Sequence, residues 1–173
     1  LTLVAVTFAV GTMLGMLAGY CGGIVDTIVM RMADILLSFP QMVLAIAVAG
    51  ILGGGMLNAM LAMGISGWTL YARLARAQAL SIKQEPYVCA ARLCGCGNLT
   101  ILFKYLLPNM IGTMVVNAST QIGTMMIGIA GLSFLGFGVM EPRAEWGSMI
   151  NQGRAYLQLS PWPVLAPAAA TVI

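Results

Sequence analysis

Three long stretches of this chain carry no charged residue, and they constrain its fold more than any other feature. They cover residues 1–23, 35–72 and 105–140. A membrane-spanning helix needs about 20 consecutive apolar residues, so the stretches are long enough to hold such helices. Only 8% of the residues are charged, compared with about 25% in a soluble domain. We therefore expect an integral membrane protein that is all-α.

The first two stretches divide into three expected spans. One covers about residues 1–20, and the stretch over residues 35–72 has room for two more, with Gly53–Gly55 between them. A polar connection precedes these two spans and is marked by Asp26, Arg31 and Asp34.

The remaining chain adds one or two spans. We expect a helix from about Asn109 to Gly128, followed by a glycine-rich re-entrant or interfacial segment, and a last span that starts at Pro161. Residues 161–173 are too few to cross a membrane, and both ends of the chain lie in apolar runs, so we expect an internal fragment of a longer subunit. The sequence predicts a polytopic helical bundle with about four to five spans, in a single domain over residues 1–173.

The basic residues predict how the bundle is oriented. Because successive loops alternate between the two sides of a membrane, six basic residues are expected on one side and two on the other. The side with more Lys and Arg is the cytoplasmic one, which places a long polar loop of about residues 73–107 in the cytoplasm. The six are Arg31, Arg73, Arg76, Lys83, Arg92 and Lys104, and the two are Arg143 and Arg154.

Motifs for catalysis are missing from the sequence. Neither Lys83 nor Lys104 follows a glycine, so the phosphate-binding motif of ATPases is absent. The chain has no His, and its acidic residues lie in loops or at membrane edges rather than in catalytic pairs. The expected spans hold no ion-coupling carboxylate. We therefore expect a non-enzymatic protein without cofactor or nucleic-acid partner, whose energy for uphill transport comes from a partner protein.

Three cysteines lie close together in the polar loop, at Cys89, Cys94 and Cys96. Structural zinc sites use four ligands at C-x2-4-C spacings, often with His, and these thiols match that pattern poorly. Cysteine also serves as a small apolar residue, which is the interpretation we favour over a metal site.

Glycine recurs every four residues in the first span, at Gly11, Gly15 and Gly19. Residues at this spacing share one helix face, and small residues there allow another helix to pack closely in a membrane. The alternative is that membrane helices are simply rich in glycine.

The span after the polar loop carries a stripe of polar residues. At 3.6 residues per turn they share one face, and a polar face in a membrane meets a partner helix or a water-filled path rather than lipid. The stripe predicts either part of a translocation pathway or hydrogen bonds between helices. Its members are Thr113, Asn117, Thr120, Gln121 and Thr124.

The spacing within the polar loop resembles a known motif. Cys89-Ala90-Ala91 is followed after three residues by Gly95 and after nine more by Tyr105-Leu106-Leu107-Pro108. This resembles the EAA loop of binding-protein-dependent ABC transporter permeases, E-A-A-x3-G-x9-I-x-L-P, with Cys89 in place of the Glu and Tyr105 in place of the Ile. Four further stretches resemble the dipeptide/oligopeptide/nickel branch, closest to the second permease of each pair: GYCGGIVDTIVMRMADILLSFP, WTLYARLARAQAL, GLSFLGFGV and EPRAEWGSMIN.

The resemblance implies an importer-type permease fold, with further membrane helices before this segment and a complete last helix after it. It also implies a prokaryotic plasma membrane, a second permease, two cytoplasmic ATPase subunits and an extracytoplasmic substrate-binding protein. In this family the loop docks on the ATPase, so small residues would allow close approach, and Tyr87 with Leu93 would anchor the contact. The residues we assign to this role are Tyr87, Cys89, Ala90, Ala91, Leu93, Gly95, Leu107 and Pro108.

The sequence therefore predicts a non-catalytic permease subunit that forms part of a pathway for nickel or for di- or oligopeptides. The stretch GLSFLGFGVMEPRAEWGSMIN favours nickel slightly. The alternative is a channel or secondary transporter that works without an ATPase. That alternative would require an ion-coupling residue within the spans, and we identify none.

Overall fold

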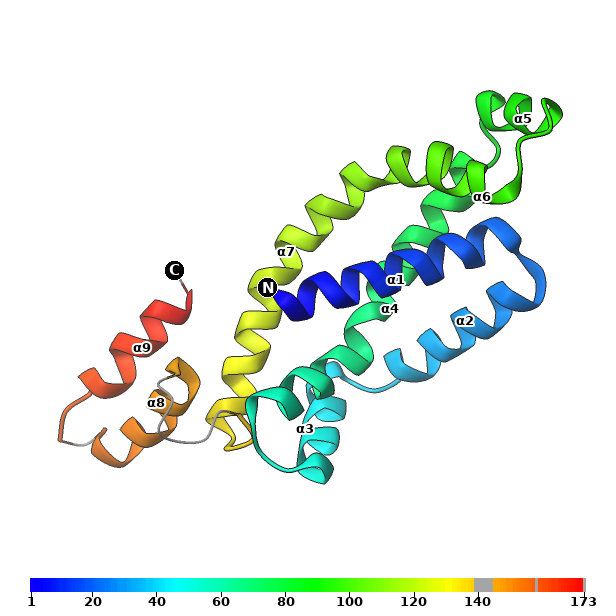
Figure 1. Cartoon of the computed structure of the whole chain (residues 1–173). Helices are drawn as coiled ribbons and strands as arrows, with labels where there is room; N and C mark the ends of the chain where they lie inside the picture. The colour runs from blue at the N-terminus through cyan, green and yellow to red at the C-terminus, as the bar shows by residue number, and fades with distance from the viewer. Residues whose placement is uncertain (139–144, 158, 173) are drawn as a thin grey trace. The chain divides into compact units, whose positions relative to one another are not determined.

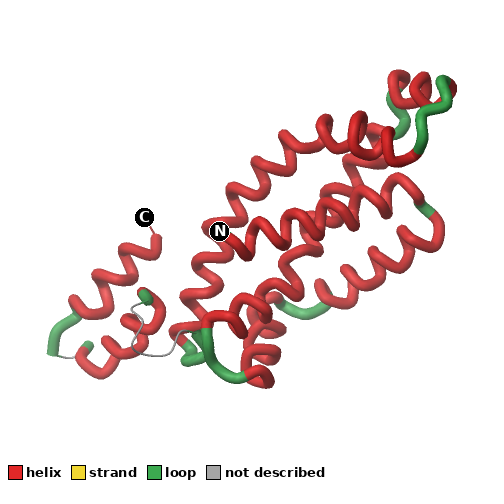
Figure 2. Tube along the Cα trace, in the orientation of Figure 1, coloured by secondary structure: helices red, strands yellow, loops and turns green. Residues whose placement is uncertain are grey.

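The computed structural model describes residues 1–138, 145–157 and 159–172, and every regular element in those ranges is helical (Figures 1 and 2). The prediction of an all-α fold is confirmed. The elements are α1 (Thr2–Cys21), α2 (Gly23–Leu37), α3 (Gln41–Leu52), α4 (Met56–Ile82), α5 (Pro86–Leu93), α6 (Asn98–Thr100), a π-helical turn (Ile101–Leu106), α7 (Leu107–Phe134), α8 (Trp146–Gly153), a 3-10 turn (Arg154–Tyr156) and α9 (Trp162–Val172).

Two of the described helical stretches are long and apolar enough to cross a membrane. They are α1 and the continuous stretch Asn98–Phe134, which has 37 residues. Helices α2 and α3 meet the same measure only as a pair, bent by 86°. Helix α4 carries Arg73 and Arg76 in its second half, and α9 has 11 residues. Length and composition thus support two spans, or three if the bent pair is one span.

Several element boundaries differ from those expected. The polar connection around residues 26–34 is helical, because α2 begins directly after the corner at Gly22. Residues 73–82, expected in the polar loop, are the last turns of α4. The helix expected to stop near Gly128 continues to Phe134, where a turn follows with Gly136 at φ +87°. The charges at residues 26–34 and 73–82 and the glycine at 128 therefore did not mark helix ends, whereas Gly53–Gly55 does separate α3 from α4.

The chain forms two compact units. The first comprises Leu1–Ser38 and Gly67–Thr120, and the second comprises Phe39–Ser66 and Gln121–Ile173. In the first unit α1 and α2 pack against each other. Their corner is made by Gly22 and Gly23, whose φ angles of +67° and +56° favour glycine over any L residue.

Two ion pairs join α2 to α4 in the first unit. Asp26 accepts two hydrogen bonds from Arg76, one of them 2.6 Å long from Nη2 to Oδ2. Asp34 accepts one of 2.5 Å from Nη2 of Arg73. These partners explain how α2 remains helical although it carries charge, since each carboxylate finds a guanidinium on the neighbouring helix.

The glycine face of α1 lies against α4 of the same unit. A Cβ atom built on Gly15 would be 2.8 Å from the Cα of Ala72, and one on Gly19 would be 2.8 Å from the backbone oxygen of Arg76. One on Gly11 would be 2.6 Å from the Cβ of Tyr71. Real Cβ atoms do not approach this closely, so the two helices touch through backbone at all three positions.

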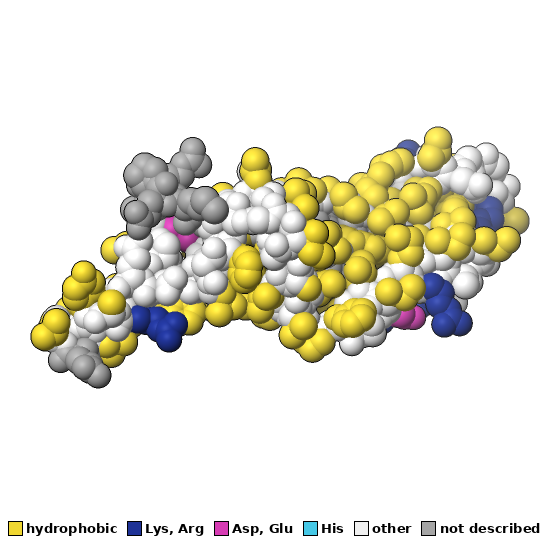
Figure 3. All heavy atoms as spheres, turned by 90° about the horizontal axis from the view of Figure 1, so that it is seen from below, with side chains coloured by type: hydrophobic (Ala, Val, Ile, Leu, Met, Phe, Trp, Pro, Cys, Tyr) yellow, Lys and Arg dark blue, Asp and Glu magenta, His cyan; other side chains and the backbone are white. Residues whose placement is uncertain are grey.

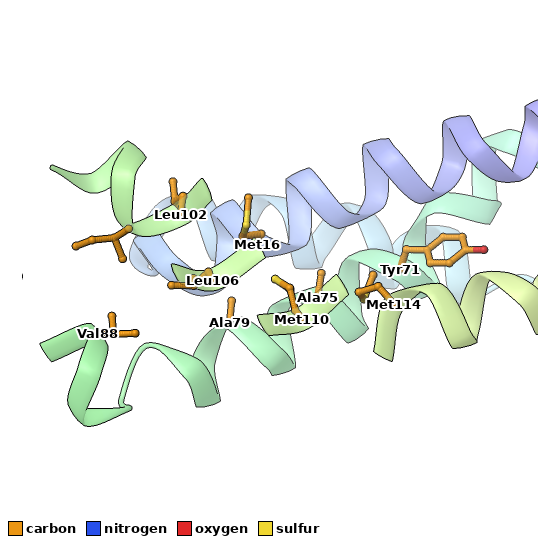
Figure 4. Packing of buried hydrophobic residues seen from close by; sticks show 10 residues of the cluster. Met16, Tyr71, Ala75, Ala79, Val88, Leu102, Leu106, Met110 and Met114 are labelled. Carbon is orange, nitrogen blue, oxygen red and sulfur yellow. The ribbon is translucent and has the colours of Figure 1, made fainter. Parts of the chain in front are cut away.

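A buried apolar cluster lies within the first unit (Figure 4). Met16 of α1, Ala75 and Ala79 of α4, Val88 of α5 and Met110 of α7 contribute to it. Each of them is fully buried. The π-helical turn adds three more buried residues, which are Ile101, Leu102 and Leu106. The cluster thus ties the short elements of the polar segment to the long helices.

The π-helical turn precedes Pro108, which sits at the second position of α7. Proline has no N–H and its ring clashes with the carbonyl four residues earlier in a regular helix. Here the N–H of Leu107 bonds the carbonyl of Leu102, five residues back. The wider turn lets the helical stretch run through the proline from Asn98 onwards.

The second unit is held together by further close helix contacts. The side chain of Met42 on α3 approaches Gly131 on α7, with 2.9 Å between its Cε and a Cβ built on the glycine. Helices α8 and α9 pack together, and a Cβ on Gly153 would be 2.9 Å from the backbone oxygen of Pro163. The guanidinium of Arg154 lies 5.1 Å above the ring of Phe134.

The surface is dominated by apolar side chains. Figure 3 shows them spread over most of one face, with Lys and Arg gathered in a few places. Exposed large residues such as Ile24, Ile35 and Leu57 are 77%, 63% and 75% accessible. Such a surface is expected where lipid or another membrane helix replaces water.

Candidate functional site

Helix α5 has one face buried in its own unit and one face open. It begins with Pro86 in its first turn, where the missing N–H costs nothing. Val88 and Ala91 point inward and are 0% and 7% exposed. Tyr87 and Leu93 are 42% and 89% exposed. The helix is thus seated by small apolar residues and presents larger ones outward.

The chain turns sharply after α5, at Gly95. Its φ of +79° lies in the left-handed region that favours glycine. The turn is closed by the N–H of Cys96, which donates to the carbonyl of Ala91 over 3.1 Å. Apart from Gly95 and its two chain neighbours, no described residue has a heavy atom within 4 Å of a Cβ built on Gly95. The glycine is therefore required by backbone conformation rather than by crowding.

The cysteines of this segment differ in exposure. Cys89, next to the exposed Ala90, and Cys94 are exposed, whereas Cys96 is half-buried against the apolar cluster. Within the described residues, no group of three or more His, Cys, Asp or Glu side chains is placed to hold a metal.

The end of α1 contacts this segment through residues that the sequence did not single out. The hydroxyl of Tyr20 donates to Oδ1 of Asn98 on α6 over 2.8 Å. The guanidinium of Arg92 on α5 lies 5.6 Å from the centre of the Tyr20 ring. Nζ of Lys83 donates to the carbonyl of Gly19 over 2.9 Å. An aromatic residue with a polar tip at the end of a span is the one signal that could have indicated Tyr20.

The other end of the segment leads into α7. Leu107 is half-buried against the apolar cluster, and Pro108 is exposed. Together with α5, they belong to one compact unit, so the structure brings all eight residues assigned to the loop into that unit.

The polar stripe lies on α7 and is only partly hidden. Asn117 and Gln121 are half-buried, while Thr113, Thr120 and Thr124 are exposed. Some of its polar groups are satisfied within the helix: Nδ2 of Asn117 donates to the carbonyl of Thr113 over 2.9 Å, and Oγ1 of Thr120 donates to that of Asn117 over 2.8 Å.

Comparison with known proteins places these features in a family. Residues 11–173 match the family described as "Binding-protein-dependent transport system inner membrane component".

Curated relatives share about two-fifths of their residues with this chain. A glutathione transport system permease protein of Pectobacterium atrosepticum is 42% identical over 167 residues, covering 96% of this chain and 56% of the relative. A dipeptide transport system permease protein of Alkalihalophilus pseudofirmus is 39% identical over 163 residues, covering 94% and 54%. A nickel transport system permease protein of Escherichia coli is 41% identical over 160 residues, covering 90% and 58%. The chain therefore spans little more than half the length of these relatives.

Proposed function

The chain belongs to the family of binding-protein-dependent transport system inner membrane components, and we propose on this basis that it is a permease subunit of an ABC importer. In this role it forms part of a translocation pathway and catalyses no reaction itself. ATP hydrolysis falls to a cytoplasmic ATPase, two copies of which pair with this subunit and a second permease. An extracytoplasmic binding protein delivers the cargo.

The observation that carries the coupling role is the contrast between the two faces of α5, one buried in its own unit and one exposed. A short helix with nothing to contact would expose polar residues outward, yet Leu93 is 89% exposed and Tyr87 42%. Its other face is fixed by Val88 within the apolar cluster. Exposed apolar side chains on an anchored helix suit a partner surface, and large side chains in such contacts contribute most of the binding energy. The resemblance to the EAA loop supports the same partner.

The orientation follows from the same proposal. The ATPase is cytoplasmic, so α5, α6 and the basic residues near them face the cytoplasm. The excess of Lys and Arg on that side agrees with the positive-inside rule. The membrane is a prokaryotic plasma membrane.

The proposed cargo is nickel or a small peptide. The relatives' names mention glutathione, dipeptide and nickel transport at nearly equal identity, which supports this group of cargoes without favouring one. The polar stripe on α7 supports a pathway for a hydrated or polar cargo. A chelated metal or a peptide would need hydrogen-bonding groups there rather than metal ligands.

Leu93→Glu provides the sharpest test of the coupling role. The side chain is 89% exposed, so the substitution leaves the chain's own packing intact while placing a charge in the proposed contact. We expect the ATPase to be lost on co-purification, and uptake of radiolabelled nickel or radiolabelled dipeptide, whichever the wild type imports, to fall to background. Protein level in the membrane should stay normal.

Leu159→Glu is the matched control, because Leu159 is 86% exposed but belongs to the second unit. It should retain the ATPase. Full ATPase binding in Leu93→Glu would show that α5 is not the contact. Gly95→Glu, which should also block coupling, is a less direct test because it adds backbone strain at a φ of +79°.

A further inference from the structure

Tyr20 links the end of α1 to two separate parts of the polar segment. Its hydroxyl bonds Asn98 at the start of α6, and its ring lies under the guanidinium of Arg92 near the end of α5. The ring is also half-buried against the apolar cluster. One side chain thus contacts both short helices that flank the turn at Gly95.

The end of α1 is itself firmly held. Its glycine face touches the backbone of α4 at Gly15 and Gly19. The carbonyl of Gly19 accepts a hydrogen bond from Lys83, which lies just after α4. A cation at the carbonyl end of a helix is stabilising through the helix dipole. Tyr20 therefore projects from a fixed support.

Helix α5 has little else to hold its orientation. It is eight residues long, and its inward contacts come from Val88 and Ala91. Residues 83–85 and 94–97 connect it to its neighbours, and most of them are exposed. An isolated helix of this length is unstable in water, so the contacts that α5 makes with the rest of the unit determine its position.

We propose that Tyr20 is a positioning residue for coupling: it fixes α5 and α6 on α1, so that the exposed face of α5 meets the ATPase in one orientation. The inference rests on the proposed function. The hydroxyl bond to Asn98 sets the position of α6, and the contact of the ring with Arg92, a cation–π interaction, sets that of α5. Movement of α5 driven by the ATPase then reaches α1 through the same side chain.

The half-buried thiol of Cys96 reports on this arrangement without any ATPase. It lies between α5 and α6 and packs against the apolar cluster. The experiment uses the full-length protein in membranes, with Cys94 changed to Ser. Mass spectrometry of the peptide that contains Cys96 measures how fast a water-soluble maleimide labels this thiol. Tyr20→Phe and Asn98→Ala should each raise the labelling rate of Cys96 about fivefold. Each removes the hydrogen bond between Tyr20 and Asn98, and losing one hydrogen bond raises by about this factor the population of arrangements in which Cys96 is accessible.

Three further variants separate positioning from general damage. The double variant of Tyr20→Phe with Asn98→Ala should label no faster than either single one, because both remove the same bond. Asn98→Asp keeps an accepting oxygen and should restore the wild-type rate. Tyr71→Phe is the matched control, since it removes a buried hydroxyl of the same unit that finds no hydrogen-bond partner among the described residues, and its labelling rate should not change.

The functional arm measures ATP hydrolysed per cargo molecule imported. This ratio should rise in Tyr20→Phe and Asn98→Ala and return to normal in Asn98→Asp, while protein level and ATPase co-purification remain unchanged. Unchanged Cys96 labelling, additive labelling in the double variant, or a normal ratio with raised labelling would each overturn the inference. If the wild-type protein binds no ATPase at all, the proposed function fails instead. The labelling of Cys96 needs no ATPase, so it still tests whether Tyr20 positions α5 and α6.

Discussion

Individual glycines serve two different purposes in this chain, and their surroundings separate the two. Gly22, Gly23 and Gly95 have positive φ angles and nothing within 4 Å of a built Cβ. They are needed for backbone shape. Gly15 is the opposite case, because it is helical and its missing side chain is replaced by the backbone of α4. The sequence spacing suggested close packing at Gly15, but it could not identify which helix fills the space.

Gly15→Ala should destabilise the protein. The added methyl group would meet the Cα of Ala72 at 2.8 Å, and backbone atoms cannot move aside as a flexible side chain can. Overpacking of this kind costs about 1–3 kcal/mol, which should appear as a lower unfolding temperature in detergent and a lower level in the membrane.

Gly112→Ala is the matched control for this substitution. Gly112 is also helical, on α7, but outside the nearby backbone of its own helix no described residue has a heavy atom within 4 Å of its built Cβ. Alanine there should be neutral or stabilise by about 0.5–1 kcal/mol, because it reduces the backbone freedom of the unfolded chain. Equal unfolding temperatures for the two variants would contradict the close contact between α1 and α4.

At the scale of the elements, hydrophobic length was a better guide than charge. The uncharged stretches led to α1 and to the stretch that contains α7, both of which are long and apolar enough to span a membrane. Asp26 and Asp34 predict a polar connection, yet they lie in α2. The reason is that Arg76 and Arg73 of α4 neutralise them, and such partners lie about 40–50 residues away in the sequence.

The loop motif was found from sequence, but its attachment was not. The resemblance covered the segment that holds α5 and the turn at Gly95, but the bounds of the helix and the φ of +79° at Gly95 come from the structure. Tyr20 and Asn98 are 78 residues apart, and neither stands out in its own neighbourhood. Contacts between distant residues need the tertiary structure, so the support of α5 was not predictable from the sequence.

The polar stripe on α7 leads to a prediction about this helix. A single Cys at Asn117 should react with water-soluble thiol reagents, and the rate should change with cargo or with the state of the ATPase. Val115 is 51% exposed on the same helix, but it lies on the side away from the stripe, where most residues are apolar and should meet lipid. A Cys at Val115 should therefore stay unreactive. Equal reactivity at both positions, or at neither, would favour hydrogen bonding between helices over a pathway.

For the whole molecule, the distribution of basic residues predicts which side of the membrane each polar segment faces. Cys94 is exposed on the segment we place in the cytoplasm. A membrane-impermeant maleimide should therefore label it in inside-out vesicles and leave it unlabelled in right-side-out ones.

Leu159→Cys should show the reverse pattern, because the second basic group that includes Arg154 is expected on the outer side. Labelling of Cys94 from the outside would refute the orientation and, with it, access of a cytoplasmic ATPase to α5.

The π-helical turn before Pro108 has a consequence for how this chain tolerates changes of length. A π-helical turn holds one residue more than a regular turn, and it places Ile101, Leu102 and Leu106 on one buried face. Deleting the half-exposed Phe103 would place Leu106 four residues after Ile101 and three residues after Leu102, and residues at these spacings are neighbours on the surface of a regular α-helix. Pro108 would then clash, so the deletion should preserve protein level only together with Pro108→Ala. Deleting Val115 instead should rotate the part of the helix before it by about 100° relative to the part after it. The protein should then fail to accumulate in the membrane, even with Pro108→Ala. The π-helical turn that leads into α7 is therefore the place where the chain can lose one residue without rotating the rest of the helix.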